Sequence, residues 1–180
     1  MKVTLCTALA LLLASGTTMA QTSPYAGQEA RPIKALSDDE LTGLAQGRGA
    51  GFAKAAELNG YPGPMHVIEL SDALALTPEQ RGASEALMHG HKARARELGA
   101  RLIDAERALD RLFAEREADA ARVDAATRRV GELHAALRGE HLKTHLEQTT
   151  LLSPRQIERY QALRGYAAGS MPAPAHVHRH

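Results

Sequence analysis

Apolar residues recur at alternating steps of three and four through the middle of the chain, which is the spacing of a helical seam. One series follows Pro78 and a second follows Asp119. The first consists of Met88, His91, Ala95, Leu98, Leu102, Ala105, Leu109 and Leu112, and the second of Val123, Ala126, Val130, Leu133, Leu137, His141, Thr144 and Gln148. The other faces carry mainly Arg, Glu, Asp and Ala. The pattern predicts two long amphipathic helices in an antiparallel hairpin, with a turn near residues 118–121.

Shorter helices are predicted before this hairpin. The stretch "SDDE" at residues 37–40 is a capping box that opens a helix ending at "GRGAG". The stretch "FAKAAELN" predicts a second short helix that stops at Gly60, because glycine suits the left-handed position after a helix end. Pro64 suits the first position of a third helix, which we expect to run to Leu76. Residues 21–36 show no apolar period and predict a flexible arm.

One five-residue pattern, Leu-(Thr/Ser)-Pro-x-Gln, occurs twice, as "LTPEQ" and "LSPRQ". In each copy the hydroxyl residue suits a helix N-cap, the proline suits the first helical position, and the glutamine suits the third position of a capping box. The two copies therefore predict corners, each of which ends one helix and begins the next. Their residues are Leu76, Thr77 and Gln80 in the first copy and Leu152, Ser153 and Gln156 in the second.

The two ends of the chain differ in composition from the helical part. Residues 1–20 combine Lys2 with an apolar run too short to span a bilayer, and "TMA" places small residues at positions −3 and −1 of a cleavage site after Ala20. These features predict a secretory signal peptide that is cleaved after Ala20. Residues 165–180 are rich in Gly, Ser, Pro and Ala, end in "HVHRH", and predict a disordered tail. One all-α domain is expected between them, at residues 37–164.

Composition limits the class of partner. Removal of the signal peptide takes away the only cysteine and one of the 22 basic residues, which leaves the basic residues balanced against 21 acidic ones. A chain without net charge is not expected to bind nucleic acid or an anionic membrane surface. The chain has no Trp and only 3% aromatic residues, so the hairpin has a thin aliphatic core. Because so thin a core needs more surface to bury, we predict a homodimer.

The nine histidines supply the candidate chemistry. His141 and His145 stand four residues apart in "HLKTH", so they share one helix face and can bind one metal ion. This is not the metalloprotease sequence HExxH, because Leu142 stands where the general-base glutamate is needed. His141 also takes a seam position, where a polar ring costs stability unless it has a partner. No other catalytic arrangement is present in the sequence, and we expect a protein that is not an enzyme.

Antiparallel packing predicts which side chains meet. A turn at residues 118–121 places His91 opposite His145, and a fold-back at Thr77 places His66 opposite His89. A site rich in histidine with one carboxylate suits Zn²⁺, Ni²⁺, Co²⁺ or copper rather than Ca²⁺ or Mg²⁺. The predicted metal ligands are His66, Glu85, His89, His91, His141 and His145. The competing interpretation is a structural helical dimer whose histidines are solvated and incidental.

The chain resembles the LTXXQ or Spy/CpxP-like family of Gram-negative periplasmic proteins. The resemblance rests on the two L-(T/S)-x-x-Q motifs in a helical, secreted chain and spans residues 64–164. It implies a small helical dimer, often cradle-shaped, in the periplasm. A branch of heavy-metal sensors and zinc-associated proteins tends to place a histidine before the first motif, a carboxylate on the next helix, and an H-x-x-x-(H/M) pair before the second motif. Here His66, Glu85 and the pair His141 and His145 occupy those places.

Two compatible functions follow from these patterns. The first is a periplasmic metal-binding protein for heavy-metal resistance or sensing, which would serve a metal or envelope-stress regulatory system. The second, implied by the wider family, is an ATP-independent chaperone that binds unfolded periplasmic proteins and limits their aggregation. The two functions are compatible, because a bound metal ion can change the conformation of the cradle or its oligomeric state.

Overall fold

The structure, a computed structural model, describes residues 22–166. The chain divides into two compact units between Ala30 and Arg31. The described part of the first unit, residues 22–30, consists of turns, one of them closed by a hydrogen bond from the Gln28 N–H to the Tyr25 carbonyl. The helices of the described residues all belong to the second unit. The predicted signal peptide and residues 167–180 of the predicted tail lie outside the described residues.

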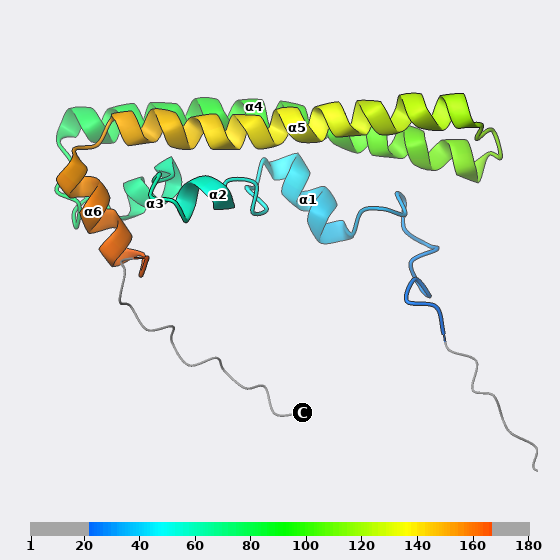
Figure 1. The fold of residues 1–180 in the computed structure, drawn as a ribbon, viewed down its shortest axis with the longest axis horizontal. Helices are drawn as coiled ribbons and strands as arrows, with labels where there is room; N and C mark the ends of the chain where they lie inside the picture. Colours follow the sequence, from blue (N-terminus) through cyan, green and yellow to red (C-terminus); the bar gives the residue numbers. More distant parts are fainter. Residues whose placement is uncertain (1–21, 167–180) are drawn as a thin grey trace, which may run out of the picture. The chain divides into compact units, whose positions relative to one another are not determined.

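The second unit is a helical hairpin with shorter helices beside it (Figure 1). Helices α4 and α5 are antiparallel, α1 packs on α4, α2 packs on α5, and α3 packs on both. No strand occurs within residues 22–166, so the predicted all-α hairpin with short flanking helices is confirmed. The helices are α1 (Asp38–Gln46), α2 (Lys54–Glu57), α3 (Pro64–Glu69), α4 (Pro78–Ala114), α5 (Ala120–Thr150) and α6 (Pro154–Leu163).

The predicted capping boxes form at the start of α1, α4 and α6. In α4, the Thr77 hydroxyl oxygen accepts from the Gln80 N–H at 3.2 Å, and the Gln80 side-chain oxygen accepts from the Thr77 N–H at 3.1 Å. Ser153 and Gln156 repeat this arrangement in α6. Each box satisfies backbone donors that the first turn of a helix leaves without an intrahelical partner. Both corner motifs are therefore helix starts.

The hairpin turn comes earlier than the sequence predicts. Helix α4 ends at Ala114, and Asp119 caps α5 by accepting the Arg122 N–H at 2.9 Å. At the end of α4 the Arg116 N–H donates to the Phe113 carbonyl, and the Glu117 N–H donates to the Leu112 carbonyl. This is the hydrogen-bond pattern of a Schellman motif. Arg116 holds the left-handed position of this motif, at φ 57°. Because glycine usually occupies that position, the sequence carried no signal for the true end of α4.

Helix α3 is also shorter than expected. It ends at Glu69, whereas the sequence predicted helix as far as Leu76. The following residues form turns in which the Leu76 N–H bonds to the Ser71 carbonyl and Ala75 has φ 49°. This path places Leu74 against Tyr160 of α6 in a small apolar cluster. Burial of these side chains therefore outweighs the helical pattern of the segment.

Two apolar cores hold the second unit together. The larger core joins α1 to the hairpin and consists of Leu44, Ala95, Leu102, Ala105, Leu133 and Leu137. The smaller core lies at the corner end and consists of Val67, Leu74, Leu152 and Tyr160. The α1 backbone approaches α4 so closely at Gly99 that a Cβ there would collide with the Leu44 carbonyl. Ile33 is also buried, and the Lys34 N–H donates to Asp110 at 3.0 Å, so the end of the predicted arm contacts the hairpin.

Candidate metal centre

The seam between α4 and α5 changes from apolar to polar toward the corners. Beyond Ala95 and Leu137, its buried residues are Ser84, His91, His141, Thr144 and Gln148. The Gln148 amide donates to the Ser84 hydroxyl at 3.0 Å, and that hydroxyl donates to the Gln80 carbonyl at 2.8 Å. Polar side chains stabilise a buried seam less than apolar ones do, even when they are bonded to one another. This half of the seam is therefore expected to serve something other than packing.

A cavity of about 670 Å³ opens beside the two seam histidines. Helices α2, α3, α4 and α5, and the loop between α1 and α2, all contribute to its wall. The cavity therefore gathers groups from distant parts of the sequence. The side chains in its wall that can ligate a metal ion are Glu57, Met65, His66, Met88, His91, His141 and His145.

His91 is held by groups on α5. Its Nδ1 lies 3.0 Å from the Thr144 hydroxyl and 3.2 Å from the Glu140 carboxylate. The Thr144 hydroxyl donates to the Glu140 carbonyl, so it accepts from His91, and Nδ1 carries the proton. The lone pair is therefore on Nε2. A histidine ligand in metal sites is commonly oriented in this way, by a hydrogen bond from its other ring nitrogen.

His145 and His66 are oriented in the same way. The His145 Nδ1 lies 2.8 Å from the Tyr61 carbonyl, which can only accept a hydrogen bond. The His66 Nδ1 lies 2.8 Å from the Glu69 carboxylate. In both rings Nδ1 is therefore the donor and Nε2 keeps the lone pair. Three histidines that line one cavity thus share the tautomer and anchoring of metal ligands.

His141 differs, because its Nε2 is buried and has no hydrogen-bond partner among the described residues. Its ring lies edge-on to the His91 ring, with 4.5 Å between the ring centroids. Burial, with a further contribution from His91, lowers the pKa of His141 to about 4. Burial also lowers the pKa of His91, although Glu140 opposes the shift. Both imidazoles are therefore neutral at pH 7, the form in which histidine ligates a metal ion.

A comparison with protein-family models identifies the family of this chain. Residues 45–159 match the family model described as heavy-metal resistance. The chain belongs to the heavy-metal resistance family. The matched range covers the hairpin, both corner motifs and every predicted ligand, so the metal-resistance branch expected from the sequence is confirmed at the level of this family. Searches of the curated proteins and of the solved structures found no match.

In this member of the heavy-metal resistance family, four of the six predicted ligands line the cavity, namely His66, His91, His141 and His145. The other two, Glu85 and His89, are exposed and lie outside its lining. His91 meets His141 on α5, one turn before the predicted contact at His145, because the hairpin turn comes early. Within residues 22–166, no three His, Cys, Asp or Glu side chains stand together as a preformed site. The candidate ligands would therefore have to move closer together to hold one ion.

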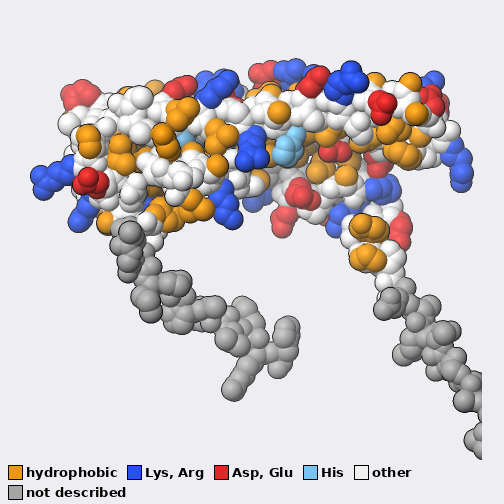
Figure 2. All heavy atoms as spheres, viewed as in Figure 1, with side chains coloured by type: hydrophobic (Ala, Val, Ile, Leu, Met, Phe, Trp, Pro, Cys, Tyr) orange, Lys and Arg blue, Asp and Glu red, His pale blue; other side chains and the backbone are white. Residues whose placement is uncertain are grey.

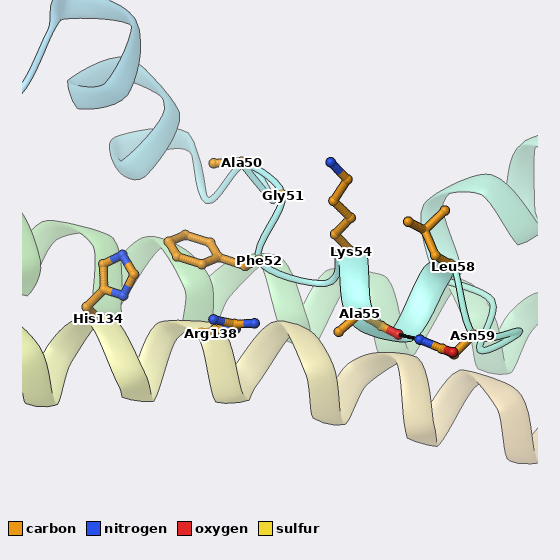
Figure 3. Close-up of a pocket in the computed structure, with 9 residues that line it drawn as sticks. All are labelled: Ala50, Gly51, Phe52, Lys54, Ala55, Leu58, Asn59, His134 and Arg138. Atoms are coloured by element: carbon orange, nitrogen blue, oxygen red, sulfur yellow. Dashed lines mark hydrogen bonds between the residues drawn. The ribbon is translucent and has the colours of Figure 1, made fainter.

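Sequence reasoning missed several residues of this centre. Phe52, from the loop before α2, stacks on the His141 ring at 5.5 Å and meets the exposed His134 ring edge-on at 5.1 Å. Figure 3 shows Phe52 beside His134 at the edge of a second cavity of about 550 Å³, which Lys54 and Arg138 also line. Nothing in the local sequence distinguishes Phe52 from an ordinary core residue, since its partners come from α5.

The two corner motifs meet each other through their glutamines. The Gln80 amide donates to the Gln156 side-chain oxygen at 3.0 Å, and the Gln156 amide donates to the Gln80 oxygen at 2.9 Å. Each amide also donates to a backbone carbonyl, of Leu151 and Leu74 respectively. The glutamines therefore join the starts of α4 and α6, in addition to capping them.

The face of the molecule drawn in Figure 2 carries charges of both signs. On the face drawn in Figure 2, Lys and Arg side chains are interspersed with Asp and Glu side chains. Among residues 22–166, every helix is either too short or too polar to cross a membrane.

Proposed function

We propose that this protein binds a transition-metal ion in the cavity at α4 and α5 and serves heavy-metal resistance or sensing in the periplasm. One observation carries the proposal. The buried His141 Nε2 has no hydrogen-bond partner within residues 22–166, and its ring stands against His91 in a cavity that His66 and His145 also line. A buried ring nitrogen without a partner is costly, and a bound cation would remove that cost.

The donor types fit a transition metal. Imidazole nitrogens suit Zn²⁺, Ni²⁺, Co²⁺ and copper, and the thioethers of Met65 and Met88 in the same wall are soft donors. Ca²⁺ and Mg²⁺ prefer sites rich in oxygen. In our proposal His91 and His141 begin the site from the seam, and His66 and His145 complete it from the rim. The role is binding, with no catalytic step.

Titration of the secreted form, residues 21–180, with Zn²⁺, Ni²⁺ and Cu²⁺ by calorimetry tests this function. We expect binding tighter than about 100 μM, which corresponds to roughly 5.5 kcal/mol. Replacing two ligands in His141→Ala/His145→Ala should weaken it more than the roughly 10- to 100-fold that loss of an outer partner costs. The exposed His89→Ala is the matched control and should bind as the wild type does. Equal affinity in the double variant would refute the proposal.

The oligomeric state belongs to the same proposal. The exposed apolar side chains Leu58, Tyr61 and Met65, at 55%, 41% and 48% exposure, favour a homodimer that covers this face. They also favour the second candidate function, an ATP-independent chaperone that holds unfolded clients. Light scattering tests the dimer, and aggregation of an unfolded client at equimolar protein tests the chaperone. Clients that still aggregate with the protein in excess would exclude the second function.

A further inference from the structure

Glu57 is a carboxylate that the predicted ligand set did not include. It is the last residue of α2 and lines the cavity beside His145. Its side chain is only 13% exposed. Oε1 accepts the Tyr160 hydroxyl at 2.6 Å and forms an ion pair with the Arg164 Nε at 3.4 Å. Tyr160 lies in α6, and Arg164 is the C-cap residue that follows this helix.

The second oxygen of Glu57 is not satisfied. Oε2 is buried and has no hydrogen-bond partner among residues 22–166. It lies 3.7 Å from the His145 Nδ1, which donates to the Tyr61 carbonyl instead. Arg164 offsets the charge of the carboxylate from the Oε1 side, but a buried oxygen without a hydrogen bond still costs stability. The negative charge of Glu57 therefore stands directly behind the Nδ1–H edge of His145.

The ring of His145 has little freedom on its other side. A Cβ on Gly63 would lie 2.7 Å from both Cε1 and Nε2 of this ring. The ring therefore packs directly on the backbone where α3 begins, and Gly63 and His145 both line the cavity. The absence of a side chain at Gly63 is what admits the ring in this orientation.

We propose that Glu57 is the positioning carboxylate of the metal site and acts through His145. The negative charge of Glu57 polarises the Nδ1–H bond of His145, which makes the Nε2 lone pair a stronger metal ligand. A cation held at Nε2 in turn offsets the charge on the unsatisfied Oε2 of Glu57. This inference rests on the proposed metal binding and adds a residue to it. Glu85, the carboxylate that the sequence favoured, is exposed and outside the cavity lining.

Co²⁺ titration of residues 21–180 tests the inference, because Co²⁺ reports both affinity and ligand field. Glu57→Gln should weaken Co²⁺ binding by about 10- to 100-fold, as loss of an outer partner of a ligating histidine does. It should also shift the visible absorption of the Co²⁺-saturated protein. Two controls should leave both readouts at wild-type values. Tyr160→Phe removes a hydrogen bond from the same carboxylate but keeps its charge, and Glu85→Gln removes the exposed carboxylate.

The outcomes separate the two proposals. Wild-type protein that binds Co²⁺, with equal affinity in Glu57→Gln, overturns the role of Glu57 alone. Equal weakening in Glu57→Gln and Tyr160→Phe also overturns it, because the effect would then be loss of packing against α6. If Glu57→Gln does not fold, Glu57→Asp provides the test. Its shorter side chain holds the carboxylate farther from His145 and should weaken Co²⁺ binding several-fold. Absence of Co²⁺ binding by the wild type overturns the proposed function and this inference together.

Discussion

At the scale of single residues, His141 combines a seam position with the chemistry of a metal ligand. Its ring occupies a place that a leucine would fill in an ordinary helical hairpin, and its exposure is 4%. Phe52 and His91 surround it, and its Nε2 has no partner among the described residues. Such a residue lowers the stability of the metal-free protein and leaves a neutral nitrogen ready for a cation.

The lowered pKa of His141 predicts how stability depends on pH. The pKa is about 4 in the folded protein, against 6.5 for a free histidine. Between these values the unfolded chain binds the proton that the folded chain excludes, so stability falls as the pH drops from about 6.5 toward 4. The slope is at most about 1.4 kcal/mol per pH unit for each proton. Urea unfolding with a chelator present, at several pH values, measures it.

A matched pair of variants assigns this slope. His141→Leu removes the titrating ring and keeps an apolar side chain in the seam, so the slope between pH 6.5 and 4 should decrease. His89→Gln removes an exposed histidine of α4 and should leave the slope unchanged. An unchanged slope in His141→Leu would show that the buried ring is not the group responsible.

At the scale of helices, the corners decide where the ligands lie. Thr77 and Ser153 start α4 and α6, and the pair Gln80 and Gln156 fastens these starts together. The corner keeps the turn after α3, and with it the His66 side of the cavity, beside α4 and α5. The repeated motif is therefore a structural joint next to the site.

A double-mutant cycle tests this joint. Gln80→Ala and Gln156→Ala should each destabilise the protein by about 1–3 kcal/mol, because each leaves the partner amide and a carbonyl without a bond. The double variant should cost less than the sum, with a coupling energy of about 0.5–3 kcal/mol. Urea unfolding of the metal-free protein measures all three. Additive costs would show that the two glutamines act only as separate helix caps.

At the scale of the whole second unit, the proposed ligands come from elements that meet only in the folded chain. Helix α3 supplies His66, α4 supplies His91, and α5 supplies His141 and His145. The apolar cores lie on either side of this polar region along the hairpin. A metal ion that gathers these ligands would therefore stabilise the docking of the short helices on the hairpin.

Metal binding should accordingly raise the free energy of unfolding. At a free ion concentration 100 times the Kd, the gain is about 2.7 kcal/mol if the unfolded chain does not bind. Thermal unfolding of residues 21–180 with Zn²⁺, and again after a chelator is added, measures the gain and its reversal. His91→Ala/His141→Ala should lose the response, whereas His89→Ala should keep it. A response that persists in the double variant would place the stabilising ion elsewhere.

The sequence by itself determined where the capped helices begin, the capping residues and the residues that face the seam. These features follow from local rules, since apolar spacing sets a buried face and a Ser or Thr before a Gln or Glu sets a helix start. It also indicated His141 and His145, because their spacing within one helix fixes a common face. Local rules did not show the true hairpin turn, because Arg116 takes a position that glycine usually marks.

Only the tertiary structure decided which groups share the cavity. The early turn paired His91 with His141, whereas Glu85 and His89 lie exposed and Glu57 lies beside His145. Contacts of this kind depend on how α2 and α3 dock on the hairpin, and a shift of one residue in register moves a side chain to another face of its helix. The sequence therefore indicated which residue types could bind a metal ion, whereas helix packing decided which of them share one cavity.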